Sequence, residues 1–139
     1  MKNQRLRRLR AALRRRPGGD RGVASTEFAV LAVVVLALGF TIIQTGFYFH
    51  AKNVAQSAAR QGVEAGRQYS AGEDDGVAQA RTYLNRFGGS VRGANVSSSG
   101  STAEMVRITV RGHVATLVPG LTMDVTEHAD APMERVTAP

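Results

Sequence analysis

One carboxylate, Glu27, lies at the entrance to a long apolar run, and a small residue, Gly22, lies five positions before it. A charged side chain in a membrane helix costs roughly 2.5–3.5 kcal/mol at the bilayer centre and less at the edge. An acid in this place therefore indicates a specific electrostatic partner. The alternative is an interfacial side chain whose carboxylate reaches back to the lipid head groups.

No other group of residues matches a catalytic or cofactor-binding pattern. The three histidines, His50, His113 and His128, are far apart in the sequence, and no HExxH, CxxC, EF-hand loop or G-x-S-x-G occurs. The acidic run 73–75 resembles a metal cluster only superficially and is typical of the start of a helix. The absence of cysteine excludes disulfides, thiolate zinc sites and cysteine nucleophiles. We therefore expect a protein that is not an enzyme and that has no cofactor and no metal.

The apolar run predicts a transmembrane helix. Residues 28–49 carry no formal charge, and as a helix they extend about 33 Å at ~1.5 Å per residue, close to the ~30 Å of hydrocarbon in a bilayer. A buried element of a soluble protein is the alternative, but the residues that follow offer too little apolar surface to enclose a segment that is apolar on all sides. A cleaved secretory signal fits less well, because such apolar regions run about 7–15 residues.

The positive charge of the chain is concentrated before this run. Residues 1–22 contain nine basic residues and one acid, and they hold a charge of +8 within a net +7 for the whole chain. By the positive-inside rule this basic leader stays in the cytoplasm and the C-terminal part lies outside. We expect the chain to be a single-pass protein of the cytoplasmic membrane that contacts lipid. Binding of nucleic acid by the arginines is a remote alternative and is not expected.

The N-terminal helix is predicted to continue past the membrane over residues 23–70. Val54, Ala58, Ala65 and Tyr69 approximate one helix face. Ala58, Gly62 and Gly66 form a stripe of small residues that lets another backbone approach closely. Packing against the protein's own second helix is slightly favoured over packing against another subunit.

Residues 71–139 are predicted to form a small domain with one helix and a sheet. The helix covers residues 76–87, with Val77, Ala80, Leu84 and Phe87 facing inward, and a Gly-Gly pair ends it. Alternating patterns predict strands at 94–98, 104–114 and 121–129, with Val106, Ile108 and Val110 on one face of the second strand, and Leu121, Met123 and Val125 alternating in the third. The fold class is therefore α+β: a long N-terminal transmembrane helix, a shorter helix and a three-stranded antiparallel sheet.

Three segments together resemble a TadE-like minor pilin or pseudopilin of the tight-adherence pilus system. They are the junction at residues 22–28, the small residues at 58–62 with Ala65, and the β-rich motifs at 108–110 and 118–120. The junction also resembles the processing site of type IV prepilins. That resemblance implies cleavage after Gly22, which would remove the basic leader 1–22 and make Glu27 the fifth residue of the mature chain.

The resemblance implies a role in pilus assembly. The partners would be a prepilin peptidase, other pilin-like subunits and the inner-membrane assembly platform, and the mature chain could reach an extracellular pilus. Glu27 would pair with the N-terminal amine of Val23 in a neighbouring subunit, because an ion pair in hydrocarbon is far stronger than one in water. Val23 departs from the phenylalanine usual at this position, although N-methylation of the new terminus is implied. The alternative function is an uncleaved, signal-anchored binding module of the cell envelope.

Overall fold

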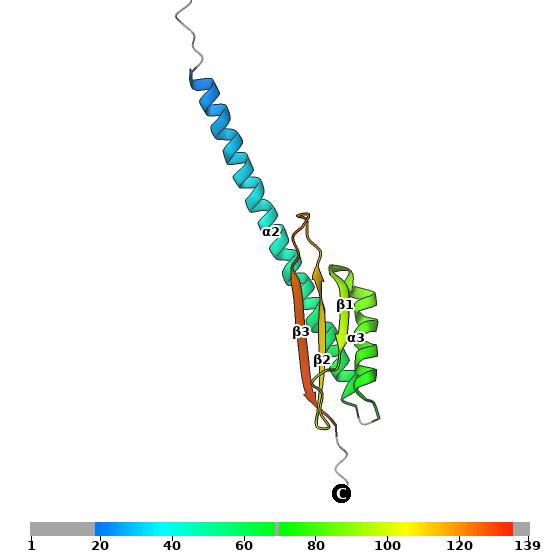
Figure 1. Cartoon of the computed structure of the whole chain (residues 1–139). Coiled ribbons are helices and arrows are strands. Elements are labelled where there is room, and N and C mark those ends of the chain that lie inside the picture. The colour runs from blue at the N-terminus through cyan, green and yellow to red at the C-terminus, as the bar shows by residue number, and fades with distance from the viewer. Residues whose placement is uncertain (1–18, 69, 135–139) are drawn as a thin grey trace, which may run out of the picture. The chain divides into compact units, whose positions relative to one another are not determined.

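The computed structural model describes residues 19–68 and 70–134, with side chains of the first helix from Ala24 onward. The chain divides into two compact units, residues 1–40 and 41–139, and each is described by itself. Figure 1 shows the elements, and their bounds are α2 (Gly19–Gly66), α3 (Glu73–Phe87), a 3₁₀ turn (Gly88–Ser90), β1 (Val91–Ser97), β2 (Met105–Val114) and β3 (Asp124–Pro132). The predicted α+β class is confirmed.

The strands form one antiparallel sheet in the order β1-β2-β3. Along β2, buried and exposed residues alternate, and the buried set is Val106, Ile108, Val110, Gly112 and Val114. This alternation shows that one face of the sheet is covered. The second half of α2 and all of α3 pack on that face. The second unit is therefore a two-layer α/β structure with its core between the helices and the sheet.

The core is built from small residues on the helices and β-branched residues on the strands. On α2 the buried apolar residues are Ala51, Val54, Ala55, Ala58, Ala59 and Val63, and on α3 they are Ala80 and Leu84. Alanines on the helix let its backbone approach the strands closely, and Ile108 and Val110, both fully buried, fill the space opposite. The predicted face of β2 is thus confirmed, and Val54 and Ala58 lie in the core while Ala65 is half-buried.

The second helix starts three residues earlier than predicted, at Glu73, because the acidic run forms its first turn. The carboxylate of Asp75 accepts a hydrogen bond from the N–H of Gly72 at 3.0 Å, which caps this end. Ala80 and Leu84 face inward as predicted, and Val77 is half-buried. The prediction that Phe87 faces inward is wrong. Phe87 is exposed, and the centroid of its ring lies 4.9 Å from that of Tyr83. The helix ends here, and Gly88 takes the buried place beside Leu84.

Two strands differ from their predicted ranges. β1 begins three residues early, and its pairing with β2 shifts between Arg92 and Asn95, where Gly93 adopts a positive φ of 59°. This bulge breaks the alternation that would have revealed the strand start. β3 begins at Asp124 rather than 121, and Leu121 lies exposed in the preceding loop. The N–H of Leu121 donates to the carbonyl of Val118 at 3.2 Å, and this turn delays the start of the ladder.

The first helix begins at Gly19 and ends at Gly66, whereas the sequence predicted residues 23–70. Beyond Gly66 the chain turns, with the N–H of Ala71 donating to the carbonyl of Gln68 at 3.0 Å. Gly66 is approached closely by the carbonyl of Gly72, so the helix ends where the chain folds back to start α3. Tyr69, which was placed on a helix face, lies outside the described residues.

Candidate functional site: the N-terminal junction and the helix seam

The junction residues lie near the start of α2. Glu27 is exposed, and among the described residues no ion pair or hydrogen bond to its carboxylate is found. Gly22 and Val23 belong to the same helix. Residues four apart share a helix face, so Val23 and Glu27 stand one above the other on α2.

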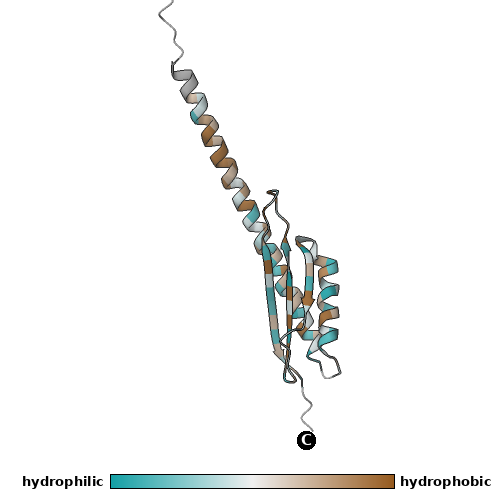
Figure 2. Cartoon of the chain, viewed as in Figure 1, coloured by the Kyte–Doolittle hydropathy of each residue, from teal (hydrophilic) through white to brown (hydrophobic). Residues whose placement is uncertain are grey.

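The apolar run that follows has the exposure of a lipid-facing surface. From Phe28 to Phe40 the large hydrophobic side chains are all at least half exposed, with Phe28 at 73%. This helix is long and apolar enough to cross a membrane, and Figure 2 shows the hydrophobic band along it. A buried core helix would have at least one covered face, and no residue of the apolar window is buried. The run therefore has the length, composition and exposure of a membrane anchor.

Protein begins to cover the helix before the predicted span ends at residue 49. Gln44 is only 7% exposed, and Ala51 is fully buried. The side-chain oxygen of Gln44 accepts a hydrogen bond from the N–H of Leu117 at 3.0 Å, and its nitrogen lies 3.5 Å from the carbonyl oxygen of Ala115. A buried amide is stabilised only if such bonds are made. Gln44 thus joins α2 to the loop between β2 and β3.

Further along, three glycines let α2 and α3 approach to backbone contact. A Cβ added at Gly62 would lie 2.7 Å from the carbonyl oxygen of Gly76, and one added at Gly76 would lie 2.8 Å from that of Gly62. At Gly66 the nearest atoms, of Gly72 and Val106, would be 3.2 Å away. Ala58 is fully buried one turn before Gly62. We call the contact of Gly62, Gly66 and Gly76 the glycine seam; it is made within one chain, against the protein's own second helix.

Ion pairs link β2 to β3 and α2 to β3. Arg107 and Asp130, opposite each other on β2 and β3, form two parallel hydrogen bonds of 2.7 and 2.9 Å. The hydrogen bonds from Arg107 lower the pKa of Asp130, and the same bonds raise the pKa of Arg107. Lys52 on α2 lies 3.7 Å from Glu127 on β3, which adds a contact between the helix and the sheet edge.

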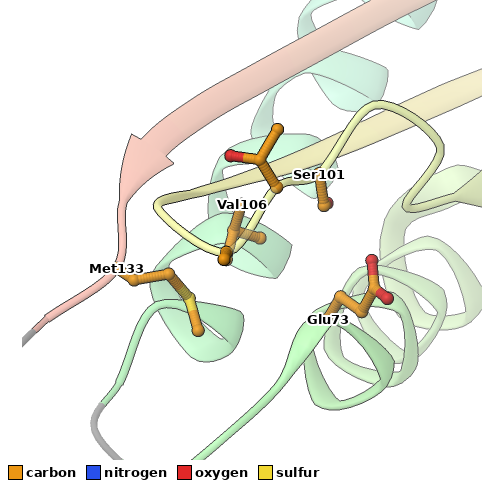
Figure 3. Close-up of a pocket in the computed structure, with 6 residues that line it drawn as sticks. Glu73, Ser101, Val106 and Met133 are labelled. Carbon is orange, nitrogen blue, oxygen red and sulfur yellow. The ribbon is translucent and has the colours of Figure 1, made fainter.

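The remaining polar groups do not form a reaction centre among the described residues. No group of three or more His, Asp or Glu side chains that could hold a metal is present in residues 19–68 and 70–134. His113 and His128 are exposed, and His113 lies 2.6 Å from Asp124 at the end of the β2–β3 ladder. An open hollow of about 350 Å³ lies between the start of α3 and the β1–β2 loop. Glu73, Ser101, Val106 and Met133 are among the residues that line it (Figure 3).

Most of α2 matches a known family model. A family model described as TadE-like protein matches residues 22–64. Residues 22–64 are TadE-like. The match begins at Gly22, includes Glu27 and the anchor, and ends two residues before the end of α2. It covers fewer than half of the residues, and α3 and the sheet lie outside it. No curated protein and no solved structure matches the chain.

Gln44 and Gly76 each have a feature in the sequence that is consistent with their role in packing. Gln44 is the only amide side chain in residues 28–49, and a polar group in an apolar run indicates a buried hydrogen bond. Gly76 was predicted to be the first residue of a helix, but it lies inside α3. A glycine inside a helix indicates close packing. Both matter because, within the second unit, they join the last part of α2 to the loop between β2 and β3 and to α3.

Proposed function

We propose that this chain is a minor pilin or pseudopilin that acts in the assembly of a tight-adherence pilus. The observation that supports this most is the extent of the TadE-like match, which starts at Gly22 and continues through Glu27 into the anchor helix. The role is structural rather than catalytic. Its partners are a prepilin peptidase, other pilin-like subunits and the assembly platform of the inner membrane.

Maturation in this proposal is hydrolysis of the peptide bond between Gly22 and Val23. Water adds across the bond, Gly22 keeps the carboxylate, and Val23 gains a free amine. The leader with its charge of +8 departs, which leaves a nearly neutral chain. The loss of this charge removes a strong tie to the anionic face of the membrane and permits the helix to move out into an assembly.

In this proposal Glu27 forms an ion pair between neighbouring subunits. The carboxylate is exposed on α2 and has no ion-pair partner in the described part of its own chain. In an assembly of staggered helices, the amine of Val23 from a neighbouring subunit supplies the compensating charge. The attraction is strong because the surrounding hydrocarbon has a low dielectric constant, and it sets the register of one subunit against the next.

The topology follows from the same segments. The leader carries nine basic residues and lies in the cytoplasm, the anchor crosses the cytoplasmic membrane, and the sheet lies outside. The partners do not include nucleic acid, because the net positive charge is confined to a leader that is removed.

The first experiment determines the N-terminus of the membrane-extracted chain by mass spectrometry, with and without a co-expressed prepilin peptidase. Wild type is expected to start at Val23, and Gly22→Val to keep the intact leader. Gly19→Val is the matched control, a second glycine near the junction, and should be processed normally. An intact leader on wild-type chain in the presence of the peptidase would exclude the pilin role and favour an uncleaved envelope-binding module.

The second experiment separates cleavage from assembly. Glu27→Gln is expected to be cut at the normal position but to co-purify with other pilin-like subunits several-fold less than wild type. Glu64→Gln, an exposed glutamate near the other end of α2, serves as the control and should assemble normally. Normal co-purification of the Glu27 variant would rule out the ion-pair role.

A further inference from the structure

The loop between β2 and β3, residues 115–123, is unusual for a surface loop because it is apolar. It contains no charged residue, and Leu117, Val118 and Leu121 are each 44–46% exposed. From Thr41 to Glu134 the other large exposed hydrophobic residues are few. They are Phe87, Met105 and four residues of α2 before His50: Ile42, Ile43, Phe47 and Phe49.

The loop is held against α2 at the level of those exposed residues. The hydrogen bond from the N–H of Leu117 to Gln44 joins the loop to the helix at one point. Within the loop, the hydroxyl of Thr116 donates to the carbonyl of Leu121 at 2.9 Å. Figure 1 shows the loop extending past the strand ends beside α2. The three aliphatic side chains are therefore presented on a fixed structure next to an apolar stretch of helix.

The charges define the boundary of this apolar zone on both elements. The pair His113–Asp124 closes the base of the loop, and on α2 the first charged residue after the apolar run is Lys52. Beyond these residues, ion pairs become frequent on the sheet and helix. This distribution fits a unit that rests on a bilayer, with its apolar end in contact with lipid and its charged residues in water.

The length of the helix supports the same placement. Residues 28–43, the part of the uncharged run before Gln44, extend about 24 Å as a helix, which is less than the ~30 Å of hydrocarbon. The helix must therefore remain in the membrane for at least another turn, where the loop already lies beside it. Tyr48, which is half-buried, is of a residue type that is enriched at membrane interfaces.

We propose that the β2–β3 loop is a second membrane contact, in which Leu117, Val118 and Leu121 insert among the lipids of the leaflet that faces the globular unit. The occupant of this surface is lipid rather than another protein, since the loop lies beside the apolar residues 42–49 of α2 and has no charged side chain. The contact fixes the orientation of the sheet on the bilayer. It rests on the membrane anchor and is independent of cleavage after Gly22.

The absence of cysteine permits a direct test in the full, uncut chain, because one introduced cysteine carries the only label. Val118→Cys and Leu121→Cys are labelled with a polarity-sensitive fluorophore in lipid nanodiscs that contain one chain each. Ala103→Cys, exposed in the β1–β2 loop at the other end of β2, is the matched control. Nitroxide-bearing lipids are expected to quench both test positions several-fold more than the control, and aqueous iodide to do the reverse.

A further variant tests whether the aliphatic side chains cause the insertion. Leu121→Asp in the labelled Val118→Cys chain should abolish most of the lipid quenching, while slow hydrogen exchange of β2 amides shows that the fold is retained. Equal iodide quenching at position 118 and at the control would overturn the proposal. Protection that appears only with several chains in one disc would also overturn it, by identifying a neighbouring chain as the occupant.

Discussion

The closest contact between the two helices yields the most demanding prediction, for Gly62→Ala. An added Cβ would lie 2.7 Å from the carbonyl oxygen of Gly76 and 3.0 Å from the Cβ of Ala80. Both neighbours are parts of a helix that cannot rotate away, so α2 and α3 must separate. Overpacking of a core typically costs about 1–3 kcal/mol, and the rigid contact places this case in the upper half of that range.

An opposing effect must be subtracted. Replacement of glycine by alanine inside a helix stabilises it by about 1 kcal/mol. Net destabilisation is therefore about 1–2 kcal/mol, since about 2–3 kcal/mol of overpacking exceeds the gain. The control is Gly46→Ala on the same helix, where no atom lies within 4 Å of the added Cβ, so only the stabilising effect should remain.

Hydrogen exchange of the β2 amides in the full, detergent-solubilised chain measures this difference. β2 is paired on both sides and packs beneath the seam, so its amides report the opening of the whole unit. A loss of 1–2 kcal/mol corresponds to exchange about 5–30 times faster. Gly76→Ala should act similarly, and the double variant should cost less than the sum because one separation relieves both contacts. If Gly62→Ala exchanged as slowly as Gly46→Ala, the argument for a tight seam would be refuted.

Three other substitutions test separate parts of the second unit. Ile108→Ala should destabilise it by about 2–5 kcal/mol, because this fully buried side chain leaves a cavity between sheet and helices, and thermal unfolding would measure the loss. Gln44→Ala should cost about 1 kcal/mol and speed exchange of the Leu117 amide, which loses its acceptor, while the β2 amides change less. Asp130→Asn should lower stability slightly at pH 7. Since the folded-state pKa of Asp130 lies below its unfolded value near 3.9, its contribution is present above that value and disappears as the pH falls through the folded pKa, so unfolding curves of variant and wild type should converge in acid.

Local patterns in the sequence predicted much of the fold. The alternation of Val106, Ile108 and Val110 was sufficient to place the central strand, because only one sheet face is buried and the period of two is unambiguous. The start of α3 was less clear: the acidic residues before Gly76 belong to its first turn rather than preceding it. The bulge at Gly93 and the turn before Asp124 moved two strand starts by about three residues, since both depend on hydrogen bonds to another strand or within a loop.

For the candidate site, the sequence alone determined the anchor, the single carboxylate at its entrance and the charge asymmetry, because hydropathy, charge and spacing along one helix need no tertiary contact. The tertiary structure decided what the small residues of α2 contact: Gly62 and Gly66 face Gly76 and its neighbours in the same chain. It also decided that Gln44 holds an apolar loop against the second part of α2. Both depend on contacts between different elements of the chain. A periodic pattern states which face of an element is apolar but not which other segment will cover it.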